Sequence, residues 1–127
     1  MTKLRTLIAD DNEMFQDLIT RVLAGIEDIE IVSIVHTGDE AVTAALQHKP
    51  DIVIIDLNMP NTGAVRAPKA IKDKLPGTFV FLCSAHSNDT LEVSTQQLGA
   101  DGYVPKDELK TGLTDMVNKV RERKKKQ

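Results

Sequence analysis

Short apolar runs alternate with stretches of helical periodicity along most of this chain. The runs are rich in β-branched and other apolar residues and are bounded by polar or turn residues, which is typical of buried strands. The stretches between them repeat apolar residues at three- and four-residue spacing, which is typical of amphipathic helices. The predicted strands are Leu4–Ala9, Ile29–Val35, Ile52–Ile55, Phe79–Cys83 and Tyr103–Val104. The helical stretches centre on Met14 to Leu23, Ala41 to Leu46, Ala67 to Leu75, Leu91 to Leu98 and Leu109 to Val120.

Five strands that alternate with five helices predict an α/β fold. Strands with nearly continuous apolar runs are buried on both faces, so we expect a doubly wound five-stranded parallel sheet with right-handed crossovers. In open sheets of this kind, ligands bind outside the carboxyl ends of the strands. The residues that close the strands are therefore the candidate site.

Capping residues agree with this division into elements. Ser, Thr, Asn and Asp favour the first position of a helix, and glycine favours a left-handed residue at its end. The expected N-caps are Thr37, in a capping box with Glu40, then Ser87 or Asn88, and Asp107. The expected left-handed residues are Gly25 and Gly99.

Composition favours one domain without disulfide support. The chain has 127 residues, of which 41% are apolar, and its single cysteine, Cys83, lies within a predicted strand as a small core residue. The N-terminus lacks the pattern of a signal peptide, and no apolar run approaches the ~20 residues of a membrane-spanning helix. We expect a cytoplasmic protein that does not enter a membrane.

Charge separates the body of the chain from its end. The formal net charge of −3 divides into −7 for residues 1–120 and +4 for residues 121–127, which carry five bases and one acid. We expect a domain over residues 1–120 and a basic C-terminal tail or linker over residues 121–127. Cations suit the end of a helix, so the tail does not by itself favour direct binding of nucleic acid.

Polar residues with complementary charges close four of the predicted strands. Asp10 and Asp11 follow the first strand, Asp56 the third, Ser84 the fourth, and Lys106 the fifth. Each is ordinary alone, as a helix cap, a turn residue or a solvated charge. Their joint placement at one edge of a parallel sheet is much harder to explain by such local roles.

This residue set suits phosphoryl chemistry. Close carboxylates raise one another's pKa unless a cation joins them, and an all-oxygen site with room for water suits Mg²⁺. Lys106 can balance Asp56 and then hold a phosphoryl oxygen, to which the Ser84 hydroxyl can also donate. Asp56 held there is a competent nucleophile towards a phosphorylated donor.

Four motifs resemble the receiver domain of two-component response regulators over essentially the whole chain: DD at 10–11, DLNMP at 56–60, SAH at 84–86 and GADGYVPKDEL at 99–109. The combination is specific, and the details GADGY and KD are closest to the subfamily whose receivers usually precede a helix-turn-helix DNA-binding domain. The resemblance implies a flavodoxin-like sheet with strand order 2-1-3-4-5.

The resemblance also implies the roles of the acidic residues. Asp56 would accept a phosphoryl group from a histidine kinase in a Mg²⁺-dependent reaction. Asp11 would bind Mg²⁺ directly, Asp10 mainly through water, Asp56 through its carboxylate, and Asn58 through its backbone carbonyl.

Further roles follow from the same resemblance. Ser84 and Lys106 would take phosphoryl oxygens, and Tyr103 would be the switch aromatic, with a plain core tyrosine as the alternative. Asn58 and His86 would line the route of attacking water and tune the lifetime of the phosphate, unless both are ordinary loop residues.

The implied protein is a signalling switch without a turnover substrate. Its partners would be a histidine kinase or phosphotransfer protein and a downstream protein or DNA-binding domain, reached through the surface of the fourth helix, fifth strand and fifth helix. A phosphorylation-dependent dimer is a further option. The rival hypotheses are a phosphorylation-independent adaptor and an Asp-nucleophile phosphatase, which would need a second acid where Asn58 stands.

Two features depart from the family pattern. Gly63 lies one residue closer to Asp56 than in most receivers, and Pro68 falls where the third helix of relatives is already running, so we expect an irregular loop and a helix that begins near Ala67. Pro105 precedes Lys106 instead of following it, and the sequence leaves the isomer of the Val104–Pro105 bond open.

Overall fold

The computed structural model describes residues 3–59, 63–85 and 88–125. Its elements alternate as predicted, and their bounds are β1 Leu4–Ala9, α1 Glu13–Ala24, β2 Ile29–Val35, α2 Gly38–His48, β3 Ile52–Asp56, α3 Ala67–Lys74, β4 Phe79–Ser84, α4 Asn88–Leu98, β5 Gly102–Pro105, a 3-10 turn at Lys106–Glu108 and α5 Leu109–Lys125. Three strands are longer than predicted, because Asp56, Ser84 and Pro105 still pair in the sheet.

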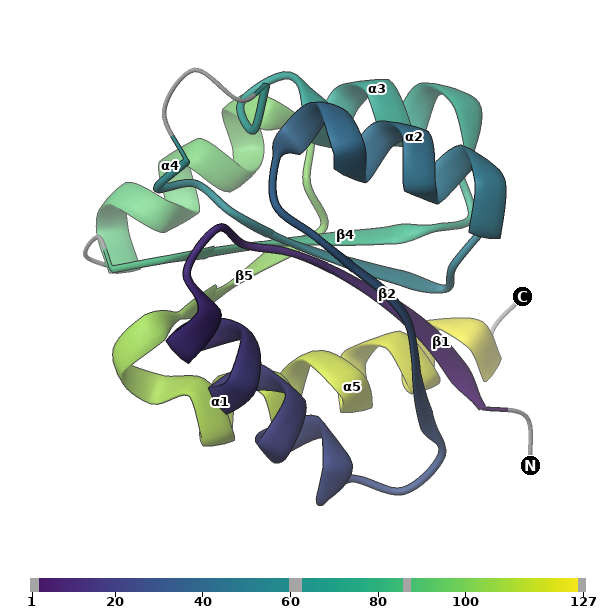
Figure 1. Cartoon of the computed structure of the whole chain (residues 1–127), viewed down its shortest axis with the longest axis vertical. Helices are drawn as coiled ribbons and strands as arrows, with labels where there is room; N and C mark the ends of the chain where they lie inside the picture. The colour runs from purple at the N-terminus through teal and green to yellow at the C-terminus, as the bar shows by residue number, and fades with distance from the viewer. Residues whose placement is uncertain (1–2, 60–62, 86–87, 126–127) are drawn as a thin grey trace.

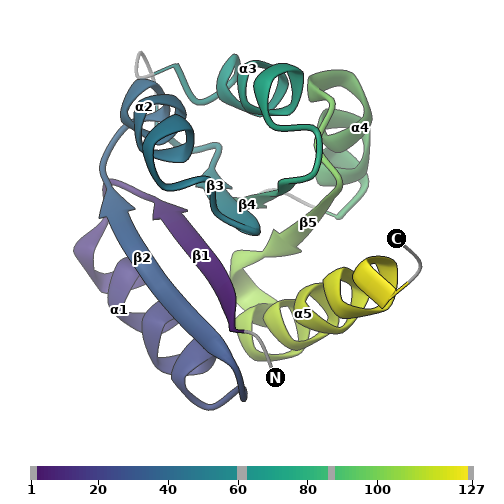
Figure 2. The same cartoon turned by 90° about the vertical axis from the view of Figure 1, so that its right-hand side faces the viewer.

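The five strands form one parallel sheet in the order β2-β1-β3-β4-β5, as the resemblance implied. Helices α1 and α5 cover one face, and α2, α3 and α4 lie on the other (Figures 1 and 2). The apolar strand residues alternate between two cores: Ile8, Ile54 and Phe81 pack towards α1 and α5, while Leu7 and Val53 pack towards α2 and α3. In the part of the chain that is described, no helix is long and apolar enough to cross a membrane.

Several local predictions are confirmed. Thr37 caps α2 by accepting a hydrogen bond from the Glu40 N–H, although the Glu40 side chain accepts from the His36 N–H instead of closing the box on Thr37. Gly99 has a φ of 77°, and α3 begins at Ala67 with Pro68 in its first turn. The side chains of Ser87 and Asn88 lie outside the described residues.

Two predictions about helix ends are wrong. Gly25 has a φ of −83° in the right-handed region, and the left-handed residue of that connection is Asp28, with a φ of 62°. Asp107 does not cap α5, because a 3-10 turn over Lys106–Glu108 precedes the helix and Asp107 lies inside it. Both connections contain the tighter i to i−3 hydrogen bonding of a 3-10 turn, which the choice of a capping residue does not reveal.

The predicted basic tail is helical over residues 121–125, as the end of α5. Arg121 donates a hydrogen bond to the Glu27 carbonyl oxygen, and Lys124 pairs with Asp51 at 2.8 Å. These contacts attach the basic end of α5 to the amino-terminal edge of the sheet, away from the candidate site.

Candidate functional site

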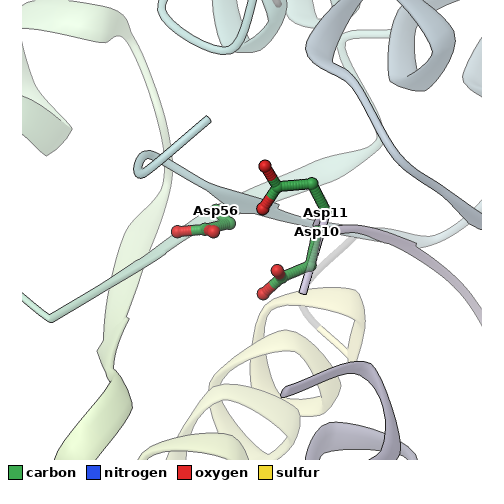
Figure 3. Close-up of side chains that lie close together, drawn as sticks. All are labelled: Asp10, Asp11 and Asp56. Carbon is green, nitrogen blue, oxygen red and sulfur yellow. The ribbon is translucent and has the colours of Figure 1, made fainter. Parts of the chain in front are cut away.

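Three acidic side chains meet at the carboxyl edge of the sheet. Asp10 follows β1 and Asp56 ends β3, and the two strands are neighbours, with Ala9 opposite Ile55. Asp10 and Asp56 are 1% and 2% exposed, whereas Asp11 is exposed. One carboxylate oxygen from each lies within 4.8 Å of the others (Figure 3). The structure thus brings together the three acids that the sequence placed at this edge.

Lys106 completes the cluster from the end of β5. Its side chain is 7% exposed, and its Nζ lies 3.1 Å from Asp56 Oδ2 and 3.5 Å from Asp10 Oδ2. The structure contains no cis peptide bond among the described residues, so the Val104–Pro105 bond that leads into Lys106 is trans. One cation therefore stands between the two buried carboxylates.

The Asp10 carboxylate is only partly satisfied. Its Oδ1 accepts a hydrogen bond from the Asn12 N–H at 2.8 Å, but no described group donates one to its buried Oδ2. Burial raises the pKa of the Asp10 carboxyl, and the charge of Asp56 raises it further, against the opposing effects of the Asn12 N–H and Lys106. A buried carboxylate oxygen without a donor, close to two further carboxylates, fits a hard cation such as Mg²⁺.

We expect Asp10→Asn to stabilise the metal-free protein at about pH 7 by on the order of 1 kcal/mol, because it removes a charge that the fold disfavours. The folded-state pKa of Asp10 is above its ordinary value of 3.8, so the penalty is present above the raised pKa and disappears as the pH falls through it. The stability difference should therefore shrink on acidification towards 3.8. Urea unfolding in EDTA at several pH values measures this, and a less stable Asp10→Asn protein would contradict it.

Asn58 connects the acidic cluster to Ser84. Ser84 ends β4 and is fully buried, and its Oγ donates a hydrogen bond to Asn58 Oδ1 at 2.9 Å. The Ala85 N–H donates to the same oxygen at 3.4 Å, while the Asn58 N–H donates to Asp56 Oδ1 at 2.9 Å. Asn58 is exposed, and its side chain joins the loop after β3 to the loop after β4.

Three further residues were singled out from the sequence, namely Tyr103, His86 and Cys83. Tyr103 is half-buried on β5, opposite Leu82, so it is not a fully buried core tyrosine. His86 lies outside the described residues. Cys83 is buried, and burial raises the pKa of its thiol to about 12, which agrees with a core residue and not a nucleophile.

Sequence reasoning missed two residues at the start of α1. The Gln16 side chain donates a hydrogen bond to the Asp10 carbonyl oxygen at 2.5 Å, and its Nε2 lies 3.1 Å from His36 Nδ1. The Phe15 ring centroid lies 3.9 Å from Lys106 Nζ. Their position in the first turns of the helix that follows the acid pair was the available signal, since that helix begins beside the site.

Comparison with known proteins agrees with this arrangement. The response regulator receiver domain family matches residues 6–118. Response regulator GacA of Pseudomonas viridiflava is 31% identical over 93% of this chain and 54% of GacA, so the chain spans about half the length of that relative. Chemotaxis protein CheY of Halobacterium salinarum is 28% identical, over 91% of this chain and 95% of CheY.

Solved structures show the same similarity. The receiver domain of AraT, a response regulator from Geobacillus stearothermophilus, superimposes with a TM-score of 0.82 at 26% identity, covering 97% of this chain and 96% of that one. The match to the family extends over nearly the whole sheet and includes every strand end that carries a polar residue of the cluster. This chain belongs to the response regulator receiver domain family.

Proposed function

We propose that this chain is a phosphorylation-activated switch in which Asp56 accepts a phosphoryl group. The observation that carries the proposal is the position of Asp56: its buried carboxylate ends a central strand, 3.1 Å from the Lys106 ammonium and beside the acid pair Asp10 and Asp11. A histidine kinase or a phosphotransfer protein is the proposed donor. The chain transfers the group only to itself and has no turnover substrate.

The acidic side chains and the Asn58 backbone carbonyl would hold Mg²⁺. Asp11 would contact the ion directly, with Asp56 and the Asn58 carbonyl oxygen, and Asp10 would do so mainly through water. The ion supplies charge neutralisation at the transferring phosphoryl group. The crowding of three carboxylates supports this placement, as does the buried Asp10 Oδ2, which has only the Lys106 ammonium at 3.5 Å beside it among the described residues.

Transfer to Asp56 needs a nucleophile and a cation at the same place. One carboxylate oxygen of Asp56 forms a bond to phosphorus, while the bond from phosphorus to the donor breaks and its electron pair leaves with the donor. Lys106 then shifts from the carboxylate towards a phosphoryl oxygen, since the product carries about −1.5 to −2 charge at neutral pH. Hydrolysis by water later restores the free carboxylate.

Ser84 is the proposed link between phosphate and surface. In this structure the Ser84 hydroxyl donates to Asn58, so donation to a phosphoryl oxygen would require that hydrogen bond to break. Movement of Ser84 would make room for Tyr103 and change the surface formed by α4, β5 and α5, on which Val93 is 53% exposed. A downstream protein, an output domain or a second receiver would recognise that surface.

We expect Asn58→Ala to bind beryllofluoride, a phosphoryl analogue, about fivefold more tightly, because one net hydrogen bond is worth ~1 kcal/mol and it holds Ser84 in the unphosphorylated position. The substitution keeps the backbone carbonyl that is proposed to bind Mg²⁺. Titration followed by amide NMR measures the affinity. In a Ser84→Ala background the gain should disappear; weaker binding by Asn58→Ala would contradict the restraining role.

The direct test of the proposed function is incubation with acetyl phosphate and Mg²⁺, followed by intact-mass measurement. We expect one phosphoryl group per chain, and none after chelation of the metal with EDTA. A folded protein that gains no mass and shows no Mg²⁺-dependent change in its amide spectrum would overturn the proposal.

A further inference from the structure

Phe15 lies against the candidate lysine from the opposite end of the chain. It is the third residue of α1, whereas Lys106 follows β5, and the ring centroid is 3.9 Å from Lys106 Nζ. The other two lysine–phenylalanine contacts among the described residues, Lys72–Phe79 and Lys119–Phe81, are 5.8 Å long. Because attraction between a cation and a ring extends to only about 6 Å, the contact at the site is the strong one.

Two contacts restrain Phe15. The Phe15 N–H donates to the side chain of Asn12, the N-cap of α1, at 3.1 Å, which fixes the first turn of the helix. The half-buried side chain also packs against the core between the sheet and helices α1 and α5. Phe15 is therefore anchored through its backbone, and its side chain lies against the core.

The Lys106 ammonium has little access to water and lies between two carboxylates. Its side chain is 7% exposed, and its Nζ forms ion pairs with Asp56 Oδ2 at 3.1 Å and with Asp10 Oδ2 at 3.5 Å. A buried cation without water needs compensation from its surroundings. The two carboxylates supply part of this compensation, and the negative face of the Phe15 ring adds to it without introducing another acid that would compete for the lysine.

We infer that Phe15 is a positioning residue that holds the Lys106 ammonium, dehydrated, at Asp56 and lets it move from the carboxylate to a phosphoryl oxygen. Attraction to a ring face depends weakly on the direction of the N–H bonds, so the ammonium can change its acceptor while it stays over the ring. An oxygen acceptor in the place of the ring would fix one N–H and resist the shift. This inference rests on the proposed function.

The test compares Phe15→Leu with Phe15→Tyr. Leucine keeps an apolar side chain but removes the ring face, so we expect roughly three- to tenfold weaker beryllofluoride binding in Mg²⁺ and a similarly slower uptake of phosphate from acetyl phosphate. Phe15→Tyr keeps the face and should behave like the parent. In a Lys106→Ala background, Phe15→Leu should have no further effect, because the ring acts through that ammonium.

A second measurement does not depend on phosphorylation. In protein labelled with ¹³C-lysine, the Lys106 methylene protons nearest Nζ should be shifted upfield by the ring, and Phe15→Leu should remove that shift without moving the signals of exposed lysines such as Lys69. Thermal unfolding of each variant confirms that it is folded, and Phe15→Met replaces Phe15→Leu if the latter is not.

The outcomes separate the two proposals. A parent protein that takes up no phosphate but shows the upfield Lys106 signal would overturn the proposed function and leave the ring contact established. A parent that is phosphorylated would overturn the inference if Phe15→Leu equals it, if Phe15→Tyr fails to restore binding, or if the effect of Phe15→Leu persists without Lys106.

Discussion

Asp56→Asn is expected to take up no measurable phosphate from acetyl phosphate, a loss of more than about 1,000-fold in rate. An amide oxygen is a far weaker nucleophile than a carboxylate, and the other two acids of the cluster lie on the loop after β1 and not at the end of the central strand. The amide keeps an oxygen that can accept the Asn58 N–H, which now bonds to Asp56 Oδ1 at 2.9 Å, so the fold should be retained. Intact-mass measurement after incubation with Mg²⁺ reports the result.

The matched control is Asp73→Asn, which makes the same chemical change at an exposed position of α3. It should be phosphorylated like the parent. If Asp56→Asn gains as much phosphate as Asp73→Asn, the acceptor is another residue and the proposed role of Asp56 is wrong.

Gly38→Ala is expected to destabilise the fold by about 1–3 kcal/mol, because it adds a side chain where two backbones touch. A Cβ atom at Gly38, the first residue of α2, would overlap backbone atoms of Gly63 and Ala64 and lie 2.6 Å from the Ala64 Cα. Backbone cannot rotate away as a side chain can, so the loop after β3 would have to move. Alanine stabilises a helix by up to about 1 kcal/mol relative to glycine, and this gain offsets part of the steric cost. The steric cost is therefore at least as large as the measured loss of stability.

Gly77→Ala is the control, since a Cβ there would meet nothing within 4 Å. It should leave the free energy of unfolding unchanged or raise it by up to about 1 kcal/mol, because it restricts the unfolded chain. Urea unfolding compares the two variants. Equal stability of Gly38→Ala and the parent would show that the loop after β3 is not packed on α2 as the structure has it.

Residues 63–64, at the end of the connection after Asp56, pack on the start of α2. Gly63 has a φ of 84°, and a Cβ there would overlap the Asp39 side chain, whose Oδ1 pairs with Arg66 at 3.6 Å. Ala64 is buried at 3% exposure. Gly63 and Ala64 thus lie against the start of α2, so we expect substitutions at that end of α2 to alter the geometry around the proposed acceptor.

The sequence by itself determined the α/β fold class and which residues were candidates for the site. The apolar runs and the helical spacing between them require a parallel sheet between two helical layers, and the carboxyl ends of parallel strands meet at one edge. Asp10, Asp11, Asp56, Ser84 and Lys106 were therefore expected near one another, since each lies at or just after the end of a predicted strand. The strand order came only from the resemblance to receiver domains.

Only the tertiary structure decided which side chains touch. The Phe15 ring beside Lys106, the Ser84 hydrogen bond to Asn58 and the backbone contact at Gly38 join segments that are far apart in the chain. The conformations of Gly25 and Asp107 were wrongly predicted for a related reason, since each depends on how a short connection meets the sheet. Periodicity specifies which face a residue occupies, whereas loop paths and side-chain rotamers are set by packing between elements, which no local pattern encodes.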